Sequence, residues 1–111
     1  TKTFHKGIDI RAPRGTPVRA IYAGEVVYAD WFRGYGNLVI IDHGSSYYSL
    51  YAHLDQIICQ QGEVVNKGDK IGYVGDTGSL KGTYLYFELR HHSKAIDPEK
   101  WLNTSCVESG E

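Results

Sequence analysis

Closely spaced turn signals limit the folds open to this chain more than any other feature of its sequence. Turn signals that contain glycine, some of them with a proline, aspartate, asparagine or serine, recur about every 8–12 residues along most of the chain. The intervening segments suit β-strands, and helical periodicity is almost absent. The predicted strands are Pro17–Ile21, Glu25–Trp31, Asn37–Asp42, Tyr47–Leu54, Glu63–Val65, Lys70–Val74 and Tyr84–Arg90. We therefore expect an all-β protein with an antiparallel sheet.

The length and composition agree with one globular domain. The chain has 111 residues, of which 41% are hydrophobic, and its 9 tyrosines and 13 glycines suit strands and turns. With 12 basic and 13 acidic residues, the formal net charge is -1, which argues against a general nucleic-acid binder. No apolar run approaches the roughly 20 residues needed to span a bilayer. These properties leave both an enzyme and a binding module open.

The two ends of the chain set the expected domain limits. The chain begins at Thr1, directly before dense sequence signals, so we expect it to be a piece of a larger protein. Near the other end, Asp97 and Pro98 have the pattern of a helix N-cap and first helical position, which predicts one helical turn. The polar segment after that turn is expected to be flexible. We therefore expect a domain over residues 1–102 and a tail over residues 103–111.

Alternation along two predicted strands separates a core face from an outer face. In Tyr47–Leu54, the even-numbered side chains are expected to face the core, whereas Tyr51 and His53 face the other way. In Tyr84–Arg90, alternate apolar side chains are expected to face the core. The outward row of that strand consists of Tyr84, Tyr86, Glu88 and Arg90. Such a row is either a recognition surface or a solvated face with cross-strand pairs.

Histidine and aspartate supply the candidate chemistry. His5 and Asp9 lie four residues apart across Gly7, and both residue types are good zinc ligands. A surface histidine near a salt-bridged aspartate would have the same spacing. His53 is either a functional imidazole or an ordinary exposed histidine. From the residues alone, both interpretations of each group stay open.

The other histidines and the cysteines are not expected to join that site. His91 and His92 are strand neighbours, so their side chains should point to opposite faces, where they cannot chelate an ion together. His43 is expected only to end a strand. Cys59 and Cys106 lack the spacing of a cysteine zinc site, and they either form a disulfide or stay free.

Several motifs follow one another along nearly the whole chain. They are His5-x-x-x-Asp9, the segment Gly34–Gly44, Tyr51-Ala52-His53-Leu54, the glycine-rich segment Gly68–Gly78, and Leu85-x-Phe87-Glu88-Leu89-Arg90. In this order they resemble the lysostaphin/LytM-type zinc endopeptidases of bacterial cell walls. The resemblance implies an all-β, antiparallel sheet domain of the LytM type, which is a duplicated hybrid motif with flanking loops.

The resemblance also implies a role for each matching position. In active members the first motif supplies two zinc ligands, so His5 and Asp9 are remnant ligands here, and His53 matches a catalytic histidine. The final strand of active members carries His-x-His. Its second histidine is the third zinc ligand, and its first acts with the catalytic histidine on the attacking water. In this chain Tyr84 replaces the first of these histidines and Tyr86 replaces the second, so the family pattern is broken there.

The two tyrosines are poor replacements for those histidines. Catalytic zinc usually needs three protein ligands and a water. Tyr86 would have to ligate as a phenolate, and ionising a phenol of pKa about 10 at pH 7 costs about 4 kcal/mol before any stabilisation by the metal. Tyr84 is a poor general base because its phenol is protonated near neutral pH. We therefore expect no peptidase activity and no cofactor, with zinc binding weak or absent.

Three further segments narrow the resemblance. They are Tyr84-Leu85-Tyr86-Phe87-Glu88 with Arg90, then Asp30-Trp31-x-x-Gly34-Tyr35-Gly36, and the closing Asp97-Pro98-x-x-Trp101-Leu102. Together they resemble the degenerate LytM domains of the murein hydrolase activator EnvC group. This implies a docking groove that binds a separate zinc-dependent N-acetylmuramoyl-L-alanine amidase and relieves its autoinhibition. Septal peptidoglycan is then cut at cell division, which implies a location in the periplasm or cell envelope.

The predicted docking surface is rich in tyrosine and arginine, which are enriched at binding hot spots. Its residues are Lys6, Tyr35, Leu38, Tyr51, Tyr84, Tyr86 and Arg90. Two alternative functions stay open, namely a peptidoglycan-binding module that localises a larger protein and a zinc endopeptidase with atypical ligands. The expected partners are therefore an amidase and, as a second candidate, peptidoglycan. Neither nucleic acid nor a transmembrane segment is expected.

Overall fold

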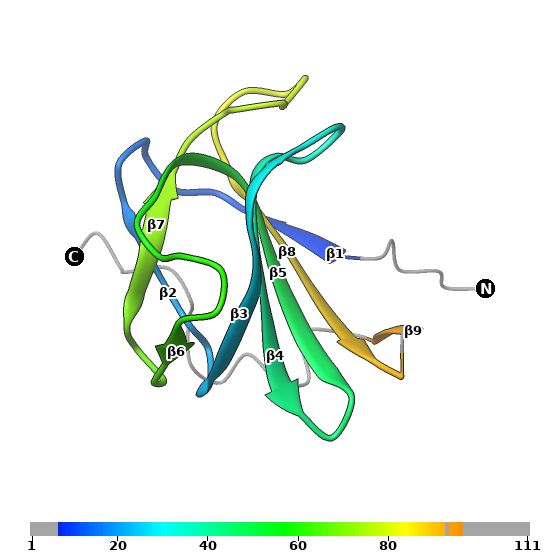
Figure 1. The fold of residues 1–111 in the computed structure, drawn as a ribbon. Helices are drawn as coiled ribbons and strands as arrows, with labels where there is room; N and C mark the ends of the chain where they lie inside the picture. The colour runs from blue at the N-terminus through cyan, green and yellow to red at the C-terminus, as the bar shows by residue number, and fades with distance from the viewer. Residues whose placement is uncertain (1–6, 93, 97–111) are drawn as a thin grey trace.

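The computed structural model describes residues 7–92 and 94–96, and all the regular elements within them are β-strands (Figure 1). The strands are β1 (Gly7–Ile10), β2 (Pro17–Arg19), β3 (Gly24–Phe32), β4 (Gly36–Gly44), β5 (Tyr47–Ile57), β6 (Val64–Val65), β7 (Lys70–Val74), β8 (Leu85–His91) and β9 (Lys94–Ile96). Every pairing between them is antiparallel, so the predicted fold class is confirmed. Within these residues, no helix could cross a membrane.

The predicted strands agree with the observed ones except near their ends. The strand over 70–74 has the predicted bounds, and the strand from Tyr47 continues further than expected, to Ile57. The sequence pattern missed β1 and β9, because segments of 4 and 3 residues are too short to show alternation. The helical turn predicted at Asp97 and the tail over 103–111 lie outside the described residues.

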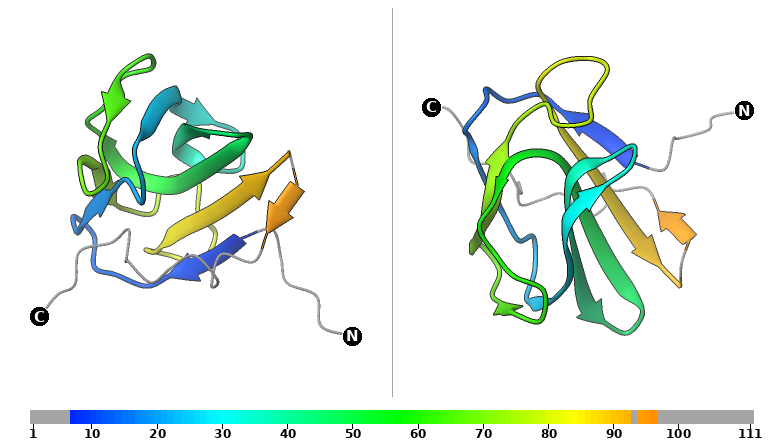
Figure 2. Two further views of the ribbon diagram at one scale, coloured as in Figure 1. Left: turned by 90° about the horizontal axis from the view of Figure 1, so that it is seen from below. Right: turned by 45° about the horizontal axis from the view of Figure 1, so that its top comes forward.

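The long strand β5 joins the two parts of the sheet. The strand order is β1-β8-β5-β4-β3-β6, while β7 pairs with β5 and β2, and β9 pairs with β8. The first part of β5 pairs with β8, and the part from Leu54 onward pairs with β7. Between these parts stands His53, whose φ of 64° breaks the regular alternation of the strand. Figure 2 shows the long strands as a fan, with the short ones at its sides.

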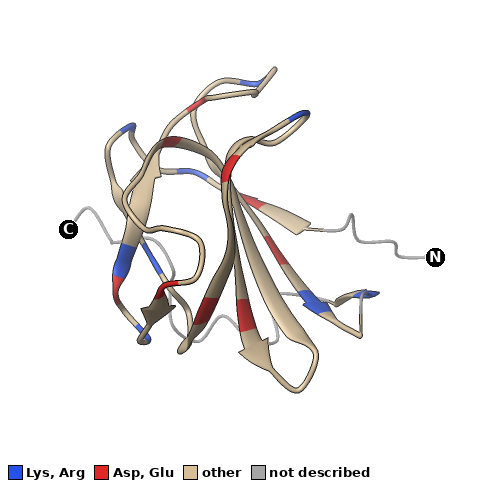
Figure 3. Cartoon of the chain, viewed as in Figure 1, with Lys and Arg blue, Asp and Glu red and all other residues tan. Residues whose placement is uncertain are grey.

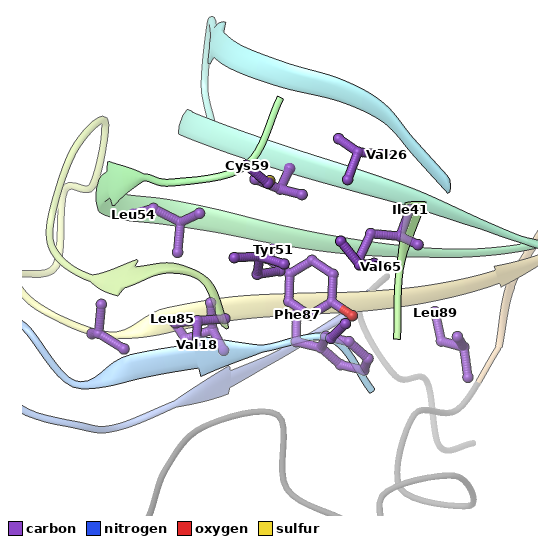
Figure 4. Close-up of a cluster of buried hydrophobic side chains, with 14 residues drawn as sticks. Val18, Val26, Ile41, Tyr51, Leu54, Cys59, Val65, Leu85, Phe87 and Leu89 are labelled. Carbon is purple, nitrogen blue, oxygen red and sulfur yellow. The ribbon is translucent and has the colours of Figure 1, made fainter. Parts of the chain in front are cut away.

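The main hydrophobic core lies against one face of this fan (Figure 4). Phe87 and Tyr51 are fully buried there, with ring centroids 5.5 Å apart. Leu85 and Leu89 belong to the same cluster, which confirms the predicted core face of the eighth strand. The cluster also contains Val18, Ala20, Val26, Val39, Ile41, Leu54, Cys59, Val65, Ile71 and Val74.

The predicted faces of β5 were wrong. Tyr51 is fully buried in the main core, while Leu50 and Ala52 belong to a smaller cluster with Leu38 on the opposite face. Both faces are covered because β5 lies in the middle of a curved sheet, so alternation separates two buried faces rather than a core from solvent. Leu54 shares the core with Tyr51 because the irregular backbone at the intervening histidine shifts the alternation.

Candidate functional site

Two cavities lie on the sheet face opposite the main core and form the candidate site. The larger is an open groove of about 870 Å³ lined by Gly7, Ile8, Asp9, Gly34, Tyr35, His53, Lys81, Tyr84 and Tyr86. The smaller is a mainly apolar pocket of about 370 Å³ lined by Val27, Tyr28, Phe32, Tyr35, Leu38, Ile40, Tyr48, Leu50 and Arg90. Tyr35 lines both cavities. The two therefore adjoin one another and offer a continuous surface for a ligand.

The backbone of His53 aims its imidazole into the groove. Its φ of 64° is uncommon for a residue other than glycine, and the local bend turns the side chain away from the main core. The backbone N–H of His53 donates to the carbonyl of Tyr35 at 2.8 Å. Its ring Nδ1 donates to the carbonyl of Thr77 at 2.7 Å, so Nδ1 carries the proton and Nε2 is the acceptor. The imidazole is thus held in one tautomer.

Thr77 links the two loops beside this histidine. Its hydroxyl donates to the carbonyl of Leu54 at 2.6 Å and accepts the backbone N–H of Asn37 at 3.1 Å. The loops pass so closely that a side chain at Gly36, where φ is +70°, would overlap the carbonyl of Thr77. Glycine is needed at this position both for the backbone conformation and for the close approach. The groove therefore has walls fixed by hydrogen bonds.

Tyr84 occupies the acceptor nitrogen of His53. Its hydroxyl donates to Nε2 at 3.2 Å, and the two ring centroids are 4.9 Å apart. Tyr84 lines the groove and is only 9% exposed, so the outward row of this strand is not a solvated face at this position. The tilted packing of its ring against the imidazole of His53 contributes to this burial. The lone pair on Nε2 of His53, which would have to bind a metal or a water, is therefore already used by the hydrogen bond from Tyr84.

Tyr86, Glu88 and Arg90 form a second linked group on the same strand. The hydroxyl of Tyr86 donates to Glu88 at 2.6 Å, and Nε of Arg90 donates to the same carboxylate at 2.9 Å. Glu88 is fully buried, which corrects the prediction that it faces outward. Burial, followed by the bond to Glu88, raises the pKa of Tyr86 well above its usual value. Tyr86 therefore stays a neutral phenol near neutral pH.

Asp9 has a partner that the sequence motifs did not indicate. Nζ of Lys81 lies 2.7 Å from a carboxylate oxygen of Asp9 and 5.3 Å from the ring centroid of Tyr84. The hydrogen bond to Asp9 raises the pKa of Lys81. Charged residues of both signs are spread over the chain (Figure 3), and only the tertiary fold selects this pair. No motif could have identified Lys81, because it lies 72 positions from Asp9.

The described residues do not fit a catalytic zinc ion. By the resemblance, Tyr86 takes the position of the third ligand, and its hydroxyl donates a hydrogen bond to Glu88 as a neutral phenol rather than offering a phenolate oxygen. Asp9 is paired with an ammonium, and the remaining remnant ligand, His5, lies outside the described residues. In residues 7–92 and 94–96, no group of three or more His, Cys, Asp or Glu side chains is placed to hold a metal.

The structure brings most of the predicted docking residues together. Tyr35, Tyr84 and Tyr86 line the groove, and Leu38 and Arg90 line the adjoining pocket. The placement of Tyr51 on the groove floor was wrong, because its side chain lies in the main core and its hydroxyl accepts from Ser49 at 2.8 Å. Lys6 lies outside the described residues. Sequence reasoning missed Lys81 and the pocket residue Phe32.

The prediction for the adjacent histidines His91 and His92 was also wrong. Their ring centroids are 4.1 Å apart, because His92 follows the end of β8 and has a φ of 53° instead of an extended backbone. The ring of His91 also stacks on Tyr47, with a centroid distance of 3.9 Å. Both lie at the other end of the strand from the groove, as expected.

His43 does more than end a strand. Its two ring nitrogens hydrogen-bond to the carbonyl of Ala23 at 2.8 Å and to the hydroxyl of Ser49 at 2.7 Å. Burial lowers the pKa of His43. Cys59 is buried with a free thiol, while Cys106 lies outside the described residues.

Comparison with known proteins places this geometry in a family. The family model described as Peptidase family M23 matches residues 3–98. The catalytic domain of the antimicrobial peptidase lysostaphin from Staphylococcus simulans superimposes with a TM-score of 0.83 at 32% identity. That match covers 90% of this chain and 80% of the lysostaphin chain.

Two curated relatives come from Escherichia coli strain K12. The uncharacterized lipoprotein YgeR is 46% identical over 99 residues, which cover 88% of this chain and 39% of YgeR. The murein hydrolase activator EnvC is 40% identical over 97 residues, which cover 87% of this chain and 23% of EnvC. The chain thus spans well under half the length of these relatives. With its antiparallel sheet, its groove and the motifs that line it, the chain belongs to Peptidase family M23, the LytM-type domains.

Proposed function

We propose that this chain is a non-catalytic activator of a cell-wall hydrolase and that the hydrolase docks in the tyrosine-lined groove. The observation that carries this proposal is that polar side chains of the groove form hydrogen bonds with one another. His53 receives a hydrogen bond from Tyr84, and Tyr86 donates one to Glu88. Among the described residues, this bonding leaves neither His53 nor Tyr86 free to act as a base toward water. The similarity to EnvC, which is named a murein hydrolase activator, supports the same role.

The hydrolase in this proposal is a zinc-dependent N-acetylmuramoyl-L-alanine amidase whose autoinhibition is relieved on docking. The setting is septal peptidoglycan splitting during cell division, in the periplasm or cell envelope. The lipoprotein name of the relative YgeR supports an envelope location. The aromatic rings suit protein docking, since tyrosine contributes a large contact area at a small cost in rotamer entropy.

The groove and the adjoining pocket offer one long contact surface. Consecutive ring contacts run from Tyr28 to Phe32, then to Tyr35 and Tyr86, with centroid separations of 5.9, 5.9 and 6.1 Å. Phe32 is 49% exposed, so this row of rings reaches solvent at the pocket. Arg90 lines the same pocket. A polypeptide segment with an apolar stripe would cover this row.

An activation assay tests the proposal. The purified chain is mixed with the amidase of the same organism and with dye-labelled peptidoglycan. We expect faster dye release than with the amidase alone, and no release by the chain alone. Unchanged release would contradict the proposal. Release by the chain alone that a chelator abolishes would instead indicate an endopeptidase, and sedimentation with purified sacculi without any amidase effect would indicate a localisation module.

A matched pair of variants tests the docking surface. Tyr35→Ala removes the ring shared by both cavities, and we expect it to reduce activation about tenfold, as for a hot-spot residue. Tyr22→Ala removes an exposed ring outside both cavities and should activate normally. Equal activation by the two variants would show that the partner does not use the groove.

A further inference from the structure

Lys81 holds a position at the remnant metal site that none of the sequence motifs assigns. Its ammonium touches the carboxylate of Asp9 at 2.7 Å and lies over the ring of Tyr84 at 5.3 Å from the centroid. By family resemblance, Asp9 is a remnant zinc ligand and Tyr84 replaces a catalytic histidine. A positive charge therefore stands between the two positions that a metal-dependent member would use around its ion.

The loop that carries Lys81 is anchored by hydrogen bonds at Lys81 and at the residues before it. The backbone N–H of Lys81 donates to the hydroxyl of Ser79 at 3.0 Å, and the N–H of Ser79 donates to the carbonyl of Asp76 at 3.0 Å. The same loop is fixed to β5 by the bond from Thr77 to Leu54. The ammonium is therefore delivered to Asp9 by a loop whose base has a defined conformation.

We propose that Lys81 is an internal cation that takes the place of the metal beside Asp9 and excludes divalent ions from the site. It acts in two ways. It occupies an oxygen of the carboxylate that a metal would need as a ligand, and its charge repels a divalent cation at short range. Tyr86 acts differently, because it removes a ligand without adding charge. Exclusion by Lys81 should therefore persist when a histidine is returned to the third ligand position.

A zinc titration tests this inference without any amidase, so its result is independent of the proposed activation. Zinc affinity is measured by competition with a chromophoric chelator in the Tyr86→His variant, with Lys81 either kept or changed to Met. We expect Lys81→Met to tighten zinc binding about tenfold in this background, because both the competing ion pair and the repulsion are lost. Lys81→Arg keeps the charge and should leave the affinity of the Tyr86→His variant unchanged.

Lys67→Met is the matched control, since it removes one positive charge from an exposed turn outside the groove. The proposal is overturned if Lys81→Met and Lys67→Met have equal effects on zinc affinity. Should Tyr86→His fail to fold, which circular dichroism would detect, both lysine variants are compared in the native background at millimolar zinc. Tighter binding by Lys81→Met than by Lys67→Met again supports the proposal, and equal binding again overturns it.

Discussion

The hydroxyl of Tyr84 donates a hydrogen bond to Nε2 of His53 over 3.2 Å, and the two rings meet at an interplanar angle of 57°. The opposite ring nitrogen of His53 donates to the carbonyl of Thr77. The imidazole is therefore bonded at both nitrogens by groups of its own chain. A histidine in this state orders the groove floor and has no lone pair left for a substrate, a water or a metal.

Removing the hydroxyl of Tyr84 tests that bond. Tyr84→Phe should lower the free energy of unfolding by about 1 kcal/mol, because Nε2 of His53 loses its donor at a nearly buried position. Urea unfolding measures the change. Tyr22→Phe, at a residue that is 61% exposed, should change stability by less than about 0.5 kcal/mol. Equal effects of the two substitutions would contradict the importance of the Tyr84 hydroxyl.

The buried carboxylate of Glu88 makes Arg90 a structural residue as well as a pocket residue. Arg90→Ala should destabilise the fold by about 2 kcal/mol, since it leaves a fully buried carboxylate without its cation. The cost stays below that of a wholly buried pair because the Arg90 side chain is 27% exposed and Tyr86 still donates to Glu88. Thermal unfolding measures it.

The double variant Arg90→Ala/Glu88→Gln serves as the control for that prediction. Replacing the carboxylate with a neutral amide should restore part of the lost stability, because no unpaired charge is then buried. If the double variant is less stable than Arg90→Ala by the full cost of Glu88→Gln alone, the two residues are not coupled. Loss of amidase activation by Arg90→Ala is informative only after this stability test.

Thr77 should control the shape of the groove without contacting a ligand. Thr77→Val removes the bonds to Leu54 and Asn37 and should cost about 1–2 kcal/mol, while Thr77→Ser keeps a hydroxyl in place and restores most of it. Chemical denaturation measures the cost, and the activation assay should follow the same order. Equal stability of the Val and Ser variants would show that the hydroxyl does not hold the loops.

The partly buried His43 predicts a loss of stability in mild acid. Burial lowers the folded pKa of His43 below its ordinary value of 6.5, so the unfolded chain binds a proton at this imidazole more readily. Above pH 6.5, His43 is neutral in both states and the protein has its full free energy of unfolding. The free energy of unfolding then decreases as the pH falls from 6.5 toward the lowered pKa of the folded state. Urea unfolding between about pH 5 and 8 should show this decline. His43→Gln should flatten it, and an unchanged slope in that variant would refute the assignment.

The thiol of Cys59 should react slowly in the native protein. Burial raises the pKa of the Cys59 thiol from its ordinary value of 9.0 to about 11, which lowers the thiolate fraction near neutral pH about a hundredfold. In a Cys106→Ser background, Ellman's reagent should therefore react far more slowly with the folded chain than with the chain in urea. Similar rates in the two states would show that Cys59 is accessible.

Period-two alternation predicted much of the fold. Leu85, Phe87 and Leu89 face the main core as the pattern of the eighth strand indicates, and the turn spacing placed seven strands near their observed positions. The same pattern failed for Tyr51 and Glu88, because alternation reports which side chains share a face and not whether that face meets solvent. Curvature of the sheet and the groove decided their burial.

The sequence by itself determined the family and the all-β architecture, because these depend on local order along the chain. It also placed Tyr84 and Tyr86 where, by the resemblance, active members carry histidine. Only the tertiary structure decided what these side chains bond to. The pairing of Lys81 with Asp9 spans 72 positions, and the bond of Tyr84 to His53 spans 31. Contacts of this range arise when the curved sheet brings strand ends and loops together, and no local pattern encodes them.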